Sequence, residues 1–202
     1  MDVCNFTTLM LGYAPNLEAL NLSLECAKAA GLDPVTYIAP KEMAFASAVM
    51  HALAQPEIVG PVLLLLDDYA VIEADHDRLA DAAAFVADEI SGCVRVYPCP
   101  PADNERGYTF SQILPGERYC ISLQAAMWDK DALRWLACRN PTWSPWAFEM
   151  AGSDEWSEQE PFAIHSVKRA ESAISYRNLL RLGCKQDGEW QAAIDGLNKE
   201  GE

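Results

Sequence analysis

An unbroken apolar run, Pro61-Val-Leu-Leu-Leu-Leu66, limits the fold of this chain more than any other feature of its sequence. A strand with one wet face alternates apolar and polar residues, whereas a run without alternation is typical of a strand covered on both faces. Such strands lie in the middle of sheets that carry helices on each side. Even when it is counted from Val59, the run has eight residues, against about 20 needed to cross a bilayer. We therefore expect a buried central strand and no membrane span.

The segments around this run alternate between strand-like and helix-like patterns, which is typical of an α/β fold. The expected strands are 7–11, 35–38, 94–97 and 118–123, and the expected helices lie within 17–30, 41–54, 76–90 and 130–136. Asp75 and Asp129 are predicted helix caps. We expect a mainly parallel central sheet flanked by helices, in one domain over residues 1–184. Residues 185–202 are read as a polar tail with one short amphipathic stretch.

The charge balance excludes one class of function. The chain has 30 Asp and Glu against 15 Lys and Arg, a formal net charge of −15. Sequence-independent binding to nucleic acid depends on Lys and Arg that neutralise phosphates, so this class is excluded. A small anionic ligand held through a metal ion stays compatible with the charge.

The N-terminus and the cysteines indicate a cytoplasmic protein. Residues 1–5 have no basic segment followed by an apolar stretch, the pattern of a secretion signal. The seven cysteines contain no Cys-x-x-Cys pair. Reduced thiols packed in a core are the favoured interpretation, and a zinc site or a disulfide framework is the alternative.

Two adjacent carboxylates, Asp67 and Asp68, follow the apolar run directly. The carboxyl ends of strands are where open α/β sheets bind ligands. Neighbouring carboxylates repel each other unless something neutralises them, and a divalent cation with oxygen ligands does so. A simple strand-to-loop cap is the structural alternative.

Several segments in consistent order carry a resemblance to a known family. They are Leu63-Leu-Leu-Leu-Asp-Asp-Tyr69, Val94 to Pro100, Tyr119 to Trp128, Ser144-Pro-Trp-Ala-Phe-Glu149 and Gly152-Ser153. Together they resemble the short bacterial and phage glycosyltransferases of the GT-A fold, similar to family-2 enzymes, over about residues 45 to 155. The resemblance implies a minimal GT-A-like, Rossmann-like fold that binds a nucleotide sugar.

The resemblance also implies a reaction and a cofactor. A sugar would pass from a nucleoside-diphosphate donor, a UDP-sugar first among them, to an acceptor hydroxyl with inversion, assisted by Mn²⁺ or Mg²⁺. Asp67 and Asp68 would fill the acidic-motif role, with Asp68 as the direct ligand. His165 is a candidate third ligand, although a lone histidine in an apolar stretch is more often structural.

Glu149 matches the acidic residue with which inverting members deprotonate the acceptor. The chemistry agrees, because an in-line displacement needs a base opposite the leaving diphosphate. Trp146 and Phe148 flank this carboxylate and would desolvate it in part. A surface cap or an ion-pair partner is the alternative role.

Further side chains are candidates for holding the donor or the acceptor. Hydroxyl and amide groups would bond a sugar, tryptophans would stack on a sugar or a base, and arginines would neutralise the diphosphate. Each of these residue types also occurs in ordinary cores and ion pairs. The candidates are Tyr13, Tyr69, Arg95, Arg118, Ser122, Gln124, Trp128 and Trp146.

Two other functions stay open. The same chemistry directed at a modified base, such as a hydroxymethylated base in phage DNA, would need a local basic strip. Its candidates are Arg134, Arg139, Lys168, Arg169, Arg177 and Arg181. A non-catalytic acidic module would instead bind a partner protein through exposed Trp143, Trp146 and Trp156.

Overall fold

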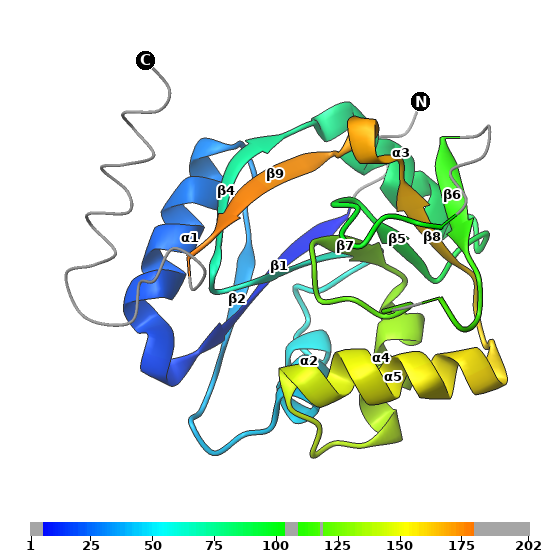
Figure 1. Ribbon diagram of the computed structural model, residues 1–202. Helices are drawn as coiled ribbons and strands as arrows, with labels where there is room; N and C mark the ends of the chain where they lie inside the picture. The colour runs from blue at the N-terminus through cyan, green and yellow to red at the C-terminus, as the bar shows by residue number, and fades with distance from the viewer. Residues whose placement is uncertain (1–5, 104–108, 118, 180–202) are drawn as a thin grey trace.

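The computed structural model describes residues 6–103, 109–117 and 119–179, which form a seven-stranded sheet between two layers (Figure 1). The strand order is β2-β1-β3-β7-β5-β8-β6. Two further strands, β4 and β9, pair in a small second sheet. The chain therefore has an α/β fold with helices on both sides of a central sheet, as the sequence predicts.

The first three strands form a parallel unit. β1 (Thr7–Tyr13) lies between β2 (Val35–Ala39) and β3 (Val62–Leu66) and runs parallel to both. Residues Val62 to Leu65 are almost completely buried, which confirms the predicted central strand. Because the chain moves from β1 to β2 and then to the other side of β1, the strand order reverses at β1. Such a reversal is the point at which open α/β sheets bind ligands.

The other half of the sheet is mixed. Its strands are β7 (Ala126–Trp128), β5 (Cys93–Arg95), β8 (Ile164–Val167) and β6 (Phe110–Ile113). β7 is antiparallel to β3 and β5, and β6 is antiparallel to β8. A parallel neighbour needs a crossover connection, usually a helix, and no helix is described between β5 and β7. The prediction of a mainly parallel sheet is therefore corrected to a mixed one.

Helices and the small sheet cover the two faces. α2 (Phe45–Leu53), α4 (Lys130–Arg139) and α5 (Pro145–Gln159) lie below the sheet in Figure 1. α1 (Leu17–Ala29), α3 (His76–Ala87), β4 (Tyr69–Ala74) and β9 (Ile174–Asn178) cover the other face. Leu64 packs with the first group and Leu63 and Leu65 with the second, because successive side chains of a strand point to opposite faces.

Local signals placed the helix starts well. Asp75 accepts a hydrogen bond from the Arg78 amide, and Asp129 accepts from the Asp131 and Ala132 amides. Both predicted caps are confirmed. Asn16, which precedes α1, ends a short 3₁₀ turn, Ala14–Asn16, and its side chain makes no capping hydrogen bond.

Three elements differ from the expectations. The strand expected over 118–123 is β7, which begins only at Ala126, after a loop held by side-chain hydrogen bonds. β4 and β9 were not expected, because their pairing joins segments about 100 residues apart. α5 was missed because its apolar residues form no single stripe.

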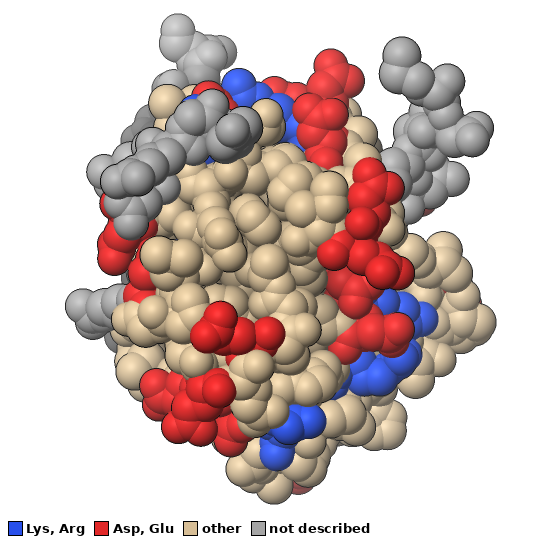
Figure 2. All heavy atoms as spheres, turned by 90° about the vertical axis from the view of Figure 1, so that its right-hand side faces the viewer, with Lys and Arg blue, Asp and Glu red and all other residues tan. Residues whose placement is uncertain are grey.

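Charged side chains are unevenly distributed over the face of the molecule in Figure 2. Acidic side chains form several separate groups around a broad uncharged area, and the basic patches are smaller (Figure 2). No helix among the described residues is long and apolar enough to span a membrane.

The described cysteines form no disulfide bonds: Cys26, Cys93, Cys99, Cys120 and Cys138 are free thiols. The predicted tail, residues 185–202, lies outside the described residues.

Candidate functional site

A pocket of about 590 Å³ opens where the strand order reverses. Tyr13, Ala39 and Leu66, at or near the ends of β1, β2 and β3, form one side of it. The opposite side comes from residues at the starts of α2 and α5 and before them: Met43, Ala44, Phe45, Ala48, Thr142, Ser144 and Pro145. Its size lies within the range of about 300–1,000 Å³ that is usual for small-molecule sites. Its walls are largely apolar, and among its described lining residues only Asp67 and Asp68 are acidic.

Asp67 is a carboxylate held in a buried position, 9% exposed. Its Oδ2 accepts a hydrogen bond of 2.9 Å from the Tyr13 amide. Burial raises the pKa of Asp67 to about 6, although hydrogen bonds from Tyr13 and Asn16 act to lower it. The charge of Asp68 raises it further. A nearby positive charge would stabilise the ionised form of such a buried carboxylate.

Asp68 is equally buried and is held from the C-terminal part of the chain. Its Oδ2 accepts a hydrogen bond of 2.7 Å from the Asn178 side-chain amide on β9. Its carbonyl oxygen accepts a bond from the Leu179 amide. Sequence reasoning missed Asn178; the alternation of Ile174-Ser-Tyr-Arg-Asn178 was the available signal for the strand that carries it.

The acidic pair fits a particular kind of metal ion site. Within residues 6–103, 109–117 and 119–179, no three His, Cys, Asp or Glu side chains converge as a complete ligand set. Mg²⁺ is usually bound through one or two carboxylates, with waters and substrate phosphates completing its shell. The donor set therefore fits an ion that arrives with a diphosphate, and not a permanent structural metal.

His165 does not belong to this site. It lies on β8, where its Nδ1 is 2.9 Å from the Ser91 hydroxyl and its ring packs on Phe85. β7 and β5 lie between β3, which leads into the acidic pair, and β8. β3 and β8 are therefore three strand spacings apart, roughly 14 Å. The prediction of His165 as a third metal ligand is wrong; the histidine is structural, and burial lowers its pKa.

Glu149 lies on α5, beyond the pocket. Ser144 caps this helix by accepting a hydrogen bond from the Ala147 amide, and Pro145 occupies its first turn. Pro145 lines the pocket, and Glu149 is on the same helix face one turn later. Glu149 Oε1 accepts a hydrogen bond of 2.7 Å from the Leu123 amide. The carboxylate is thereby fixed at the side of the loop before β7.

Tyr69 connects the acidic pair with Glu149. Its buried hydroxyl donates a hydrogen bond of 2.6 Å to the Leu123 carbonyl oxygen. The pKa of this phenol is raised, mainly by burial, and the charges of Asp68 and Glu149 both contribute. Both carboxylates are therefore near one tyrosine. The prediction that Tyr69 binds substrate is wrong, because its hydroxyl is used inside the protein and its ring stacks on Tyr176.

Ser122 and Gln124 lie on the same loop as Leu123. The buried Ser122 hydroxyl is 3.3 Å from the Cys99 carbonyl oxygen and 3.4 Å from Glu149 Oε1. Gln124 accepts a hydrogen bond from the Tyr176 hydroxyl. Ser122 therefore contacts Glu149 directly, and Gln124 joins the loop to β9. A contact of Gln124 with a substrate stays a prediction.

Arg95, one of the two predicted arginines, does not line the pocket. Arg95 is 2% exposed, and its guanidinium donates to the carbonyl oxygens of Pro100, Tyr119 and Cys120. Burial lowers its pKa. Its role is to hold the loop between β5 and β7, so the prediction that it neutralises a diphosphate is wrong. Arg118 lies outside the described residues.

The tryptophans divide into buried and open rings. Trp128 is 1% exposed within β7, so the prediction that it stacks on a sugar is wrong. Trp156 is also buried, and its Nε1 donates to the Phe162 carbonyl oxygen. Trp143 is half-buried against Phe148. Trp146 is 65% exposed and precedes Glu149 by three residues on α5, which leaves it as the open aromatic ring beside this carboxylate.

The described basic residues proposed for DNA are spread over separate elements of the fold. Arg134 and Arg139 are on α4, where Arg134 pairs with Asp131 and Arg139 lies over the Trp135 ring. Arg177 is on β9, on the opposite side of the sheet from α4 (Figure 1). Lys168 follows β8, the side chain of Arg169 is not described, and Arg181 lies outside the described residues.

Comparisons with known proteins add little to this geometry. No protein-family model and no curated protein matches the chain. Among solved structures, it is similar to the crystal structure of A197 from STIV, with 14% identity and a TM-score of 0.47 over 81% of this chain and 83% of that chain. The functional argument therefore rests on the site itself.

Proposed function

We propose that this protein transfers a sugar from a nucleoside-diphosphate donor to an acceptor hydroxyl, with Mn²⁺ or Mg²⁺ as cofactor. A UDP-sugar is the first candidate donor, and a minimal GT-A-like fold is the corresponding finer fold assignment. One observation carries the proposal. Asp67 and Asp68 line the pocket at the strand-order reversal, and the buried Tyr69 is near both Asp68 and Glu149.

The donor half explains why a metal would be needed. The apolar walls beside Tyr13 suit a planar base and a ribose. No Lys or Arg is among the described lining residues, so this part of the chain offers no side-chain cation to a diphosphate in the pocket. An ion held by Asp67 and Asp68, when bound, would neutralise the diphosphate and stabilise it as a leaving group. The buried carboxylates themselves need such a partner charge.

The acceptor half gives Glu149 the role of base. Its Oε1 is fixed by the Leu123 amide, whereas its Oε2 has no hydrogen bond within the described part of the chain. This second oxygen would take the proton from the acceptor hydroxyl as the bond to the sugar forms. Trp146, one turn away, offers an exposed ring on which an acceptor sugar would stack. A base that approaches opposite the diphosphate gives inversion.

A donor-hydrolysis panel tests the proposal. The protein is incubated with UDP-, GDP-, ADP-, CDP- and dTDP-sugars, with and without Mn²⁺, and the released nucleotide is measured. We expect Mn²⁺-dependent release from one donor class, and loss of release in Asp68→Asn. The matched control is Asp81→Asn, which removes one exposed carboxylate from α3. No binding of any nucleotide in the presence of Mn²⁺ would refute the proposal.

The two alternatives receive less support. A DNA acceptor needs a continuous basic surface, and the candidate residues are divided between α4 and β9. A partner-binding module needs exposed tryptophan anchors, and Trp156 is buried. Adding duplex DNA with hydroxymethylated bases to the acceptor panel tests the first alternative directly.

A further inference from the structure

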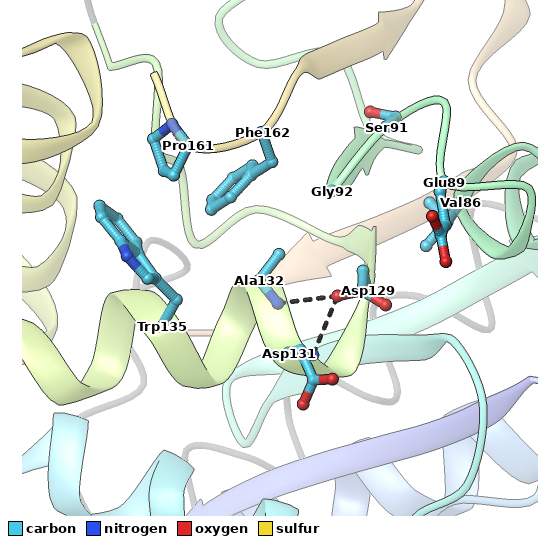
Figure 3. Close-up of a pocket in the computed structure, with 10 residues that line it drawn as sticks. All are labelled: Val86, Glu89, Ser91, Gly92, Asp129, Asp131, Ala132, Trp135, Pro161 and Phe162. Carbon is cyan, nitrogen blue, oxygen red and sulfur yellow. Dashed lines mark hydrogen bonds between the residues drawn. The ribbon is translucent and has the colours of Figure 1, made fainter. Parts of the chain in front are cut away.

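A second pocket, of about 340 Å³, lies beside the starts of β5 and α4 (Figure 3). Gly92, which lines it, precedes β5, and Asp129 follows β7. β5 runs in the same direction as β3, because both are antiparallel to β7. The start of β5 and the end of β3 therefore lie at opposite edges of the sheet, so this pocket is separate from the candidate site.

The pocket has one aromatic side and one acidic side. Trp135 and Phe162 form the aromatic side, with ring centroids 5.8 Å apart and planes at 90°. The Phe162 ring lies directly on Gly92, where a Cβ atom would be 2.5 Å from the ring. The carboxylates of Glu89, Asp129 and Asp131 come from the other side in Figure 3. None of the described residues that line the pocket is Lys or Arg.

Two contacts at the edge of the pocket indicate the chemistry that its walls attract. The Arg139 guanidinium lies 4.3 Å from the centroid of the Trp135 ring. The Arg134 guanidinium is 2.6 Å from Asp131 Oδ1. Guanidinium groups stack on indole faces and pair with carboxylates, and they are less strongly hydrated than ammonium groups. Both kinds of contact thus already occur on residues that line the pocket.

We propose that this pocket binds a guanidinium group on a short alkyl stem. The stem would lie against Trp135 and Phe162, and the guanidinium would face Glu89 and Asp129. Three carboxylates line the pocket, and Arg134 is the cation paired with one of them, so negative charge remains for a ligand. The volume is near the lower end of the range for ligand sites, which suits one such group and not a nucleotide. The ligand would be either a free guanidine compound or an arginine side chain of another protein.

Nuclear magnetic resonance on the ¹⁵N-labelled full chain tests this proposal. Butylguanidinium is the probe, and neutral butylurea, which has nearly the same shape, is its control. We expect saturable shifts of the Trp135 indole N–H and the Gly92 amide with butylguanidinium only. Equal shifts with butylurea, or no saturable shift with butylguanidinium, would overturn the proposal.

Variants locate the binding. Glu89→Gln removes one exposed carboxylate that would face the guanidinium and leaves the Asp129 cap intact. We expect the Kd to rise about two- to fivefold, as one exposed ion pair would give. Asp81→Asn on α3 is the charge-matched control and should leave the Kd unchanged. An equal effect of both variants would refute a local site.

A peptide distinguishes the two sources of the ligand. Acetyl-Gly-Arg-Gly-amide is titrated under the same conditions. Shifts of the same two signals would indicate an arginine side chain of a partner protein, and butylguanidinium binding without peptide binding would indicate a free guanidine compound. Either result supports the pocket, and neither depends on the proposed transferase activity.

Discussion

Replacing Asp67 with Asn should make the protein more stable at neutral and alkaline pH. Asn is neutral at every pH and nearly the same size, and its side-chain oxygen can accept the Tyr13 amide as Asp67 Oδ2 does. The substitution therefore removes a buried negative charge and keeps its hydrogen bond. Functional sites often hold such unfavourable groups at a cost in stability.

The magnitude follows from the pKa of Asp67. Burial raises it from an ordinary 3.8 to about 6, and each pKa unit corresponds to about 1.4 kcal/mol. The folded protein binds this proton more tightly than the unfolded chain does. Stability from this group is therefore fully present below about pH 4 and is lost as pH rises through 6. Above pH 7 the charged Asp67 costs about 3 kcal/mol, which Asp67→Asn should recover.

Urea denaturation between pH 4 and 8 measures this difference. We expect the stability gain of Asp67→Asn to be near zero at pH 4 and to reach about 3 kcal/mol at pH 8. Asp81→Asn, an exposed change of the same charge, should show a small difference with little dependence on pH. A gain independent of pH, or a loss of stability at pH 8, would refute the claim that Asp67 is a buried charged group.

Three further substitutions test other parts of the structure. Glu149→Gln should lower sugar transfer about 10²- to 10⁴-fold without weakening nucleotide binding, measured by kinetics and by titration calorimetry. Trp146→Ala should raise the acceptor KM and leave donor hydrolysis and the melting temperature unchanged, because the ring is exposed. Arg95→Leu should cost about 3 kcal/mol of stability or more, because three loop carbonyl groups lose their donor and each buried group left without a partner costs about 1–3 kcal/mol; a change below about 1 kcal/mol would contradict this role.

Local sequence patterns predicted the parallel half of the fold. The apolar run ending in Asp67 and the caps Asp75 and Asp129 each act within a few residues, and the structure places all three as expected. The mixed half depends on which strand lies beside which. That choice is made by packing between distant segments, and the short β7 strand carries no pattern of its own.

The same division holds for the candidate site. The acidic pair could be named from residue types and Glu149 from the family resemblance, and the structure brings Asp68 and Glu149 near Tyr69. The roles of Arg95 and Trp128 could not be predicted, because burial decides them. Asn178 could not be connected to Asp68 from the sequence, because no local rule links residues 110 positions apart.

This long-range hydrogen bond has a consequence for biosynthesis. A ribosome has to add 110 residues after Asp68 before Asn178 exists. Until then, β4 has no partner strand and the acidic pair lacks its support from β9. An interrupted chain that already has β1, β2 and β3 would carry both carboxylates without their final surroundings. The pairing with β9 therefore delays completion of the candidate site until synthesis has passed Asn178.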